Sequence, residues 1–283
     1  MSFSNCLIGG SGRSGSTILK KILQEHSEIF ALPYELQITV CPDGLIDFFC
    51  SIESCWSPQL FDSKISRLKS VLKSIGEKPN LMSNIIDGLL RSSGISKKMN
   101  MKSVPRYNEY SLLQYCENYQ NLVDKFIDEL TDFKYSGWFI GHNTFHRESI
   151  HFSESQTSQK IARIIRKFYT GVIENMMGDH GAKWYVDDTP WNLLFFEKFL
   201  QILPNSKLIH IYRDPRDVVA SYIHKNWSPS NPVQATMYYK SCMQYWWKIR
   251  EKLNKNSYLE FDFESLINDT ERTLKNLCLF LDL

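Results

Sequence analysis

Short apolar runs alternate with longer segments in which apolar positions recur at helical spacing, and this alternation is clearest towards the two ends of the chain. The first apolar run, residues 3–8, precedes a Gly/Ser-rich loop and a helical pattern over residues 16–26. Beyond about residue 160 the pattern predicts strands at 183–186, 207–212 and 258–263 and helices at 161–177, 191–203, 215–225, 232–253 and 264–281. Short buried strands that alternate with helices are typical of a parallel sheet covered on both faces. We therefore predict an α/β fold of three layers, α/β/α, around a central parallel sheet.

The middle of the chain, residues 41–160, has a different character. It is rich in Ser, Lys and Asn, with amphipathic helical patches at 64–75 and 110–130 and a strand-like stretch at 138–142. No internal repeat divides it from the rest. We predict one domain, residues 1–283, with a core of about 1–40 and 160–283 and a helical substrate-binding insertion of about 41–160 over the active site.

Composition excludes several classes of protein. Hydrophobic residues make up 43% of the 283 residues and charged residues 23%, as in ordinary globular proteins and unlike disordered or collagen-like chains. The formal net charge of +2 is too balanced for a protein that depends on nucleic-acid electrostatics. No run approaches the roughly 18 apolar residues that span a bilayer. We expect neither a nucleic-acid partner nor a membrane partner.

The seven cysteines are scattered and form no CxxC pair, which gives no zinc-site spacing. The first residues lack the basic and apolar regions of a signal peptide. We expect thiols in a reducing, cytoplasmic location, and no bound metal.

The Gly/Ser loop at residues 9–17 lies between the first expected strand and the first expected helix. Glycines allow positive φ, and the loop amides add to the positive end of the helix dipole, so the loop suits phosphate or sulfate, although a flexible surface turn could share this composition. Gly10, Gly15 and Thr17 match the Walker A frame of a P-loop NTPase-like fold, but Ser16 stands at the lysine position. Arg13 supplies a cation inside the loop instead.

A second charged segment, residues 213–217, follows the expected strand 207–212. Pro215 suits the first turn of a helix, and Asp214 can cap it. Arg213 therefore lies at the carboxyl end of a strand, where open α/β sheets bind ligands. Ser221 comes about two helical turns later; a capped helix with a surface serine would also explain this pattern.

Together the two segments resemble the sulfotransferase family, which uses 3′-phosphoadenosine 5′-phosphosulfate (PAPS) as donor and releases PAP. Residues 183–192 and 261–283 extend the resemblance, which covers about 1–40 and 160–283 and looks closest to the branch of tyrosylprotein, heparan and bacterial small-molecule sulfotransferases. The resemblance implies a 5′-phosphosulfate site formed by Arg13, Ser14, Gly15, Ser16 and Thr17, and a 3′-phosphate site formed by Arg213 and Ser221. It also implies a P-loop NTPase-like fold and a reaction without metal.

The sequence departs from this family beside its Thr-Pro pair. Many relatives carry a lysine there, which neutralises charge on the leaving group, whereas this chain has Asp188; Arg13 or Lys183 would have to replace that lysine. Sulfuryl transfer also needs a general base. The resemblance points to Glu35 after the first helix as the base, with Asp188 as the reserve candidate and His146 as the third; Glu35 could instead be a solvated carboxylate.

The acceptor cannot be named from these motifs. Asp187, Asp188 and Glu35, with the tryptophans at 138, 184 and 191, could form an acidic aromatic pocket for a cationic acceptor, or the tryptophans could be core. The leading interpretation is a sulfotransferase that acts on a hydroxyl or amine of a small metabolite, possibly as a homodimer. A P-loop kinase and a non-catalytic nucleotide-binding module are the alternatives.

Overall fold

The structure is a computed structural model that describes residues 3–76, 111–137, 139 and 149–283. Contacts divide the chain into two compact units, Met1–Val40 with Met177–Leu283, and Cys41–Met176. The second part of the core was predicted to begin at about 160, whereas it begins at 177 in this division. Helix α7 (Ser158–Met177) accounts for the difference, since its residues cluster with the inserted segment.

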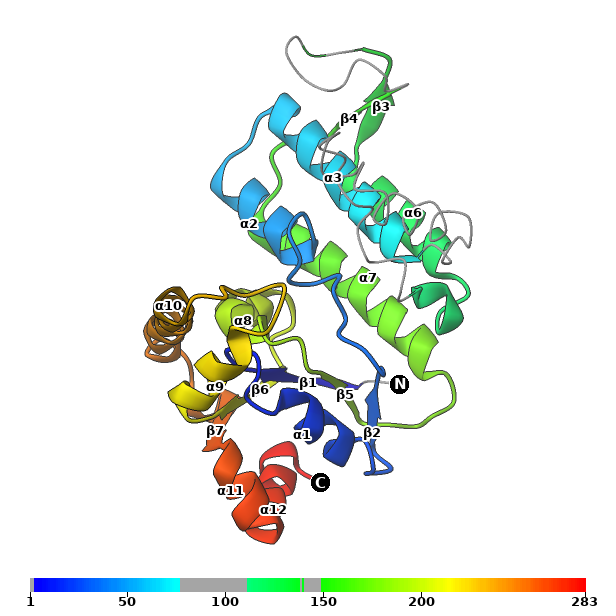
Figure 1. Cartoon of the computed structure of the whole chain (residues 1–283). Helices are drawn as coiled ribbons and strands as arrows, with labels where there is room; N and C mark the ends of the chain where they lie inside the picture. The colour runs from blue at the N-terminus through cyan, green and yellow to red at the C-terminus, as the bar shows by residue number, and fades with distance from the viewer. Residues whose placement is uncertain (1–2, 77–110, 138, 140–148) are drawn as a thin grey trace, which may run out of the picture. The chain divides into compact units, whose positions relative to one another are not determined.

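A parallel sheet organises the first unit (Figure 1). Among the described residues it has five strands in the order β2-β5-β1-β6-β7. They are β1 (Ser4–Gly9), β2 (Ile29–Ala31), β5 (Trp184–Asp187), β6 (Lys207–Tyr212) and β7 (Tyr258–Asp262). Register pairs Leu7 with both Asp187 and Leu208, so the strands end at one edge of the sheet. That edge carries the loops that the sequence singled out.

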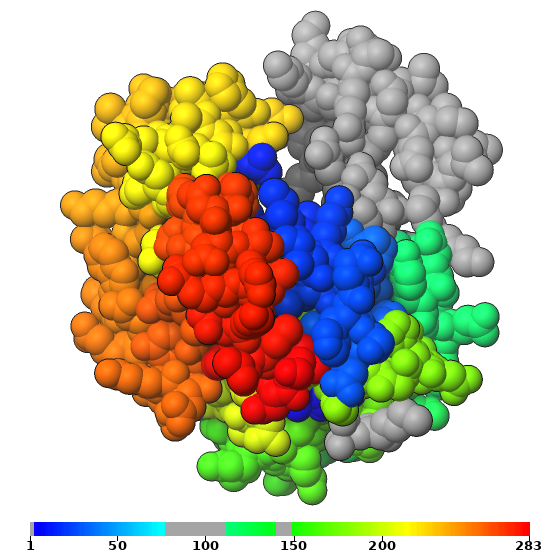
Figure 2. Space-filling model, turned by 90° about the horizontal axis from the view of Figure 1, so that it is seen from below, coloured from blue at the N-terminus to red at the C-terminus, as the bar shows by residue number. Residues whose placement is uncertain are grey.

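Helices cover both faces of this sheet. On one face α1 (Ser16–Leu23), α11 (Phe263–Asn268) and α12 (Thr270–Leu281) bury their apolar sides against alternate residues of β1 and β6. Figure 2 shows α12 beside α1 on this face. The helices α8 (Asn192–Ile202), α9 (Pro215–Tyr222) and α10 (Pro232–Arg250) lie on the other side in Figure 1. The predicted three-layer α/β/α fold is confirmed.

The second unit is mostly helical. Its helices are α2 (Leu45–Ser54), α3 (Pro58–Gly76), α6 (Tyr119–Leu130) and α7, with a short 3-10 turn at Leu112–Gln114. The two strands β3 (Phe133–Tyr135) and β4 (Ile150–Phe152) form an antiparallel pair. The predicted strand at 138–142 falls almost entirely outside the described residues.

Several predicted helix ends are wrong, each for a local reason. The pattern at 264–281 predicted one helix, but Asp269 has non-helical backbone angles and separates α11 from α12. Apolar periodicity continues across this break because both helices use the same core. The helix predicted at 110–130 begins only at Tyr119, after the 3-10 turn.

Candidate active site

The β1–α1 loop has the backbone of an anion site. Gly12, Arg13 and Gly15 have φ values of 80°, 60° and 101°, in the left-handed region. Gly15 is the N-cap of α1, and no side chain among the described residues caps this helix. The first-turn amides add to the positive end of the helix dipole.

Contacts from three other segments hold this loop in place. The Tyr222 hydroxyl, fully buried, donates a hydrogen bond to the Ser11 carbonyl oxygen. The Gly10 N–H donates to the Pro190 carbonyl oxygen at 3.1 Å. A Cβ on Gly15 would overlap the Phe263 ring, so only glycine fits both the space and the φ value there. The loop is thus preorganised by its neighbours.

The predicted 5′ residues divide into two groups. Arg13, Ser16 and Thr17 line a cavity of about 440 Å³. Ser14 is fully buried behind the loop, and within the described part of the chain its hydroxyl has no hydrogen-bond partner. Gly15 contributes its backbone conformation and its close contact with the Phe263 ring.

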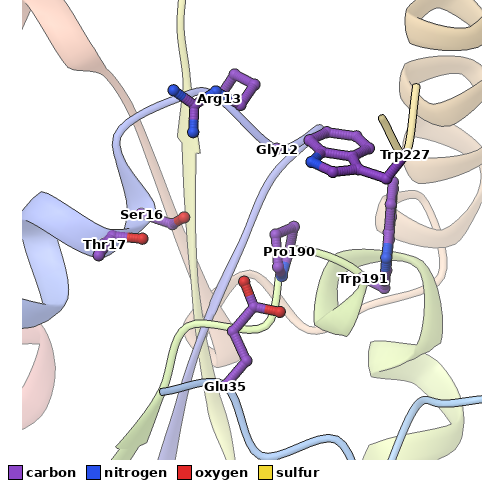
Figure 3. A pocket seen from close by; sticks show the side chains of 8 residues that line it. All are labelled: Gly12, Arg13, Ser16, Thr17, Glu35, Pro190, Trp191 and Trp227. Atoms are coloured by element: carbon purple, nitrogen blue, oxygen red, sulfur yellow. The ribbon is translucent and has the colours of Figure 1, made fainter. Parts of the chain in front are cut away.

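The cavity combines a cation, a carboxylate and aromatic rings (Figure 3). Its lining residues are Gly12, Arg13, Ser16, Thr17, Glu35, Pro190, Trp191 and Trp227. Figure 3 shows the Glu35 carboxylate pointing into the cavity, with Ser16 and Thr17 on one side and the two tryptophans on the other. The volume suits a small ligand.

Glu35 has the protonation behaviour of a proton acceptor. Burial, followed by the negative charges of Asp187 and Asp188, raises the pKa of Glu35 to about 7, although Lys20 and a hydrogen bond from Gln37 act in the opposite direction. The next residue, Leu36, donates its N–H to Asp187 at 2.8 Å and fixes the segment. A carboxylate with a pKa near neutrality is suited to general-base catalysis.

The two aspartates at the end of β5, Asp187 in its last position and Asp188 directly after it, lie in the interior and not on the cavity wall. Asp187 accepts hydrogen bonds from Leu36, Thr189 and Asn192, and burial is the main reason that its pKa is raised. Asp188, the reserve candidate for the base, forms an ion pair with Lys20 at 2.5 Å. Both aspartates therefore act on the site from behind Glu35.

The second predicted segment forms much as expected. Asp214 caps α9 by accepting a hydrogen bond from the Arg216 N–H at 2.8 Å, and Pro215 is in the first turn. Arg213 pairs with Asp217 at 3.0 Å, and its guanidinium lies 5.2 Å from the centre of the Phe263 ring. The Arg213 Nε is buried and, among the described residues, has no hydrogen-bond partner.

The structure brings the two motifs together. The Arg13 Nε donates to the Ser221 hydroxyl at 2.9 Å, across 208 positions of sequence. Phe263 contacts both motifs, since its ring faces Gly15 and Arg213. The residues predicted to bind the two ends of one ligand are thus neighbours.

Two other candidates lie away from the cavity. Trp184 is a core residue, which is the alternative that the sequence left open, and donates its indole N–H to the Leu281 carbonyl oxygen at 2.9 Å. Lys183 precedes β5 at the opposite edge of the sheet and pairs with Glu28 at 2.5 Å. His146 and Trp138 lie outside the described residues.

Sequence reasoning missed two contributors, Trp227 and Lys20. Trp227 lies between α9 and α10 in a Ser-, Asn- and Pro-containing stretch with no periodicity to mark it. Its ring packs on Gly12 and, edge-on, 6.3 Å from the Trp191 ring. Lys20 comes one turn after Ser16, and this spacing could have placed it behind the loop.

The described residues hold neither a metal-binding cluster nor a helix able to span a membrane. Within residues 3–76, 111–137, 139 and 149–283, no group of three or more His, Cys, Asp and Glu could hold a metal ion. No helix in that part of the chain is both long enough and apolar enough to cross a membrane.

Solved structures share this fold. A "Sulfotransferase Domain from the Curacin Biosynthetic Pathway" superposes with a TM-score of 0.51 and 16% identity over 100% of this chain and 75% of the other. A "Sulfotransferase Domain from the Synechococcus PCC 7002 Olefin Synthase" has a TM-score of 0.49 and 14% identity, over 100% and 74%. No curated protein matches the sequence significantly.

The sequence model described as "Sulfotransferase family" matches residues 94–283, which include the segment from Arg213 to Ser221. The match covers well over half of the chain. The β1–α1 loop lies outside it, yet the structure places that loop against the matched segment through Arg13 and Ser221. The protein therefore belongs to the sulfotransferase family and is a sulfotransferase enzyme.

Proposed function

We propose that the protein transfers a sulfuryl group from PAPS to a hydroxyl or amine of a small metabolite. One observation carries this proposal: a carboxylate with a pKa of about 7, Glu35, shares one cavity with Arg13 and the uncapped start of α1. A proton acceptor then faces an anion site across a space that suits a small acceptor.

The chain's residues fit a donor with two anionic ends. Arg13, Ser16, Thr17 and the first amides of α1 would hold the phosphosulfate. Ser221 and Arg213 would hold the 3′-phosphate, and the unpartnered buried Nε of Arg213 supports a missing acceptor there. PAPS supplies the sulfuryl group and leaves as PAP with the electron pair of the broken S–O bond.

Glu35 acts on the acceptor. Its carboxylate takes the proton from the hydroxyl or amine as the new bond to sulfur forms, which prevents positive charge from building up on the attacking atom. Arg13 and the start of α1 stabilise the negative charge that develops on the opposite side. Most of the remaining catalysis is positioning, as in phosphoryl transfer.

The aromatic wall supports a neutral or cationic acceptor. Trp191 and Trp227 line the cavity next to Glu35, and the faces of indole rings attract cations. Edge contacts with Tyr238 and Tyr222 hold these rings in place, at 6.1 Å for Trp191 and 5.4 Å for Trp227. A polyanionic acceptor would instead approach Glu35 with unfavourable charge.

Thermal unfolding with PAP and ATP tests the donor. Saturating PAP, at one hundred times Kd, should add about 2.7 kcal/mol to the free energy of unfolding and raise Tm by several degrees. ATP lacks the 3′-phosphate and should raise Tm much less. Equal shifts would overturn the roles of Arg213 and Ser221.

A screen of labelled PAPS against pooled metabolites tests the reaction, with and without EDTA. Label transfer that survives EDTA is the expected result. Activity that EDTA abolishes and Mg²⁺ restores would favour the kinase alternative. PAP binding without transfer to any acceptor would favour the non-catalytic module.

A further inference from the structure

A buried ion pair lies directly behind the cavity. Lys20 and Asp188 approach to 2.5 Å, and their side chains are only 3% and 1% exposed. Removing two charges from water is costly, and such pairs often contribute little net stability. The stability of the fold therefore does not by itself explain why this pair is buried.

Both partners are close in sequence to residues of the cavity wall. Lys20 follows Ser16 by about one turn of α1, and Asp188 precedes Pro190 by two residues. The pair thus joins α1 to the segment after β5. The neighbouring Asp187 is bonded to the Leu36 N–H, so this segment also holds the backbone next to Glu35.

The charged groups near Glu35 come from three segments. Asp187 ends β5 and Asp188 follows it, Lys20 comes from α1, and Arg13 lines the cavity on the β1–α1 loop. The pKa of Glu35 is raised by burial first and then by the two aspartates, and Lys20 lowers it. The two members of the ion pair therefore act on Glu35 in opposite directions, and Asp188 has the larger influence.

The pair also accounts for the departure noted in the sequence. Many relatives in the resembling family carry a lysine beside Thr-Pro, where this chain has Asp188. Here the cation paired with this position is Lys20 on α1. Asp188 without Lys20 would be an uncompensated buried charge, so the two positions work as a unit.

We propose that Lys20 and Asp188 are positioning residues for proton transfer: their buried ion pair locks α1 to the segment after β5 and sets the electrostatic field at Glu35. This inference rests on the proposed role of Glu35 as the base. The pair would set the electrostatic field at the base although neither of its residues lines the cavity.

The test measures Glu35 directly, without donor or acceptor. Carboxyl carbon-13 NMR follows the titration of Glu35, and the signal lost in Glu35→Gln assigns it. We expect Asp188→Asn to move the midpoint to lower pH by about one unit, as for loss of a nearby charge. Lys20→Met should move it to higher pH by a smaller amount, because Asp188 has the larger influence. Lys21→Met, an exposed lysine on the same helix, is the matched control and should leave the midpoint unchanged.

A charge-swapped variant covers the case in which the single variants do not fold. Lys20→Glu combined with Asp188→Lys keeps an ion pair but reverses its direction. The larger influence, at position 188, then changes sign, so the Glu35 midpoint should fall. An unchanged midpoint in a folded swapped variant, or single variants that lose only thermal stability, would show a purely structural pair and overturn the proposal.

The pH dependence of kcat/KM then separates this inference from the proposed function. Its acidic limb should move with the NMR midpoint in each variant. Moved midpoints with an unmoved limb would overturn the positioning role, although sulfuryl transfer itself would stand. If Glu35→Gln keeps full activity, the base assignment fails first, and the positioning role fails with it.

Discussion

The two segments proposed to bind the donor are built in different ways. The β1–α1 loop offers backbone amides in a fixed conformation. Gly12, Arg13 and Gly15 have positive φ, and Tyr222 and Pro190 form hydrogen bonds with the loop backbone. The segment after β6 offers side chains that are already paired, Arg213 with Asp217 and Arg216 with Asp214. The first segment is rigid and specific in shape, whereas the second has charges that must exchange partners to bind a ligand.

This difference predicts different roles for the two segments. The rigid loop shares its cavity with Glu35, so the reacting atoms would meet groups that need no rearrangement. The paired arginine lies beside the loop and contacts the same Phe263 ring. Changes at Glu35 should therefore affect turnover, changes in the loop should affect both turnover and donor affinity, and changes in the second segment should affect donor affinity alone.

The largest effect is expected from Glu35→Gln. The amide keeps the size of the side chain but cannot take up a proton, so kcat should fall by about 10² to 10⁴, as for loss of a general base. PAP affinity, measured by calorimetry, should hardly change because the phosphate-binding residues remain. Glu25→Gln, an exposed residue beyond α1, is the control. A kcat above about a tenth of the wild-type value would exclude Glu35 as the base.

Gly15→Ala should damage the rigid segment next most severely. The alanine Cβ meets the Phe263 ring at a φ of 101°, so we expect loss of PAP binding together with a fall of about 1–3 kcal/mol in the free energy of unfolding. Gly181→Ala is a matched control, because its φ of 69° carries the same kind of strain, with no atom within 4 Å of the added Cβ. If both variants bind PAP like the wild type, the loop is not the anion site.

The same contrast explains which parts the sequence could predict. The strands β1, β5 and β6 are short and mostly apolar, and their positions were predicted to within a residue or two. Arg13 and Ser221 were assigned to opposite ends of the donor, and the structure places them in hydrogen-bond contact. Motif residues indicate the chemistry of a site, and in a parallel sheet the loops that follow the strands lie at one edge.

Contacts between distant segments could not be predicted. Nothing in the stretch around Trp227 shows that its ring packs on Gly12, and Trp184 resembled a pocket residue although it lies in the core. The sequence did not show that Asp188 is paired with Lys20, which belongs to another element, and Asp188 was therefore considered as a base. Such pairings depend on how helices and strands meet, which one-dimensional patterns do not contain.

Arg213→Lys tests the second segment and should have a smaller effect. Lysine cannot bind a phosphate through two parallel hydrogen bonds, so PAP affinity should fall by about tenfold, equivalent to about 1.4 kcal/mol. Asp217→Asn should instead raise PAP affinity, since it removes the carboxylate that competes for Arg213. Arg216→Lys is the control, as that side chain is 90% exposed and already held by Asp214. Calorimetry that gives the Arg213→Lys and Arg216→Lys variants equal affinity would remove Arg213 from the donor site.

The smallest effects are shifts in Tm with pH, and they distinguish the two segments by sign. The folded pKa of Glu35, about 7, is above its usual value of 4.5, so the folded state holds this proton more tightly than the unfolded state. The stability that Glu35 contributes is therefore present at low pH and is lost as the pH rises towards 7. Glu35→Gln cannot titrate, so its Tm relative to the wild type should be several degrees higher at pH 8 than at pH 5.

Asp214 behaves in the opposite way, because hydrogen bonds from Arg216 lower its pKa to about 2. Its contribution is lost only as the pH falls through about 2, so Asp214→Asn should lower Tm by the same amount at pH 5 and pH 8. Equal pH dependence in the two variants would mean that Glu35 titrates as an ordinary surface carboxylate, and the buried base would lose its physical support.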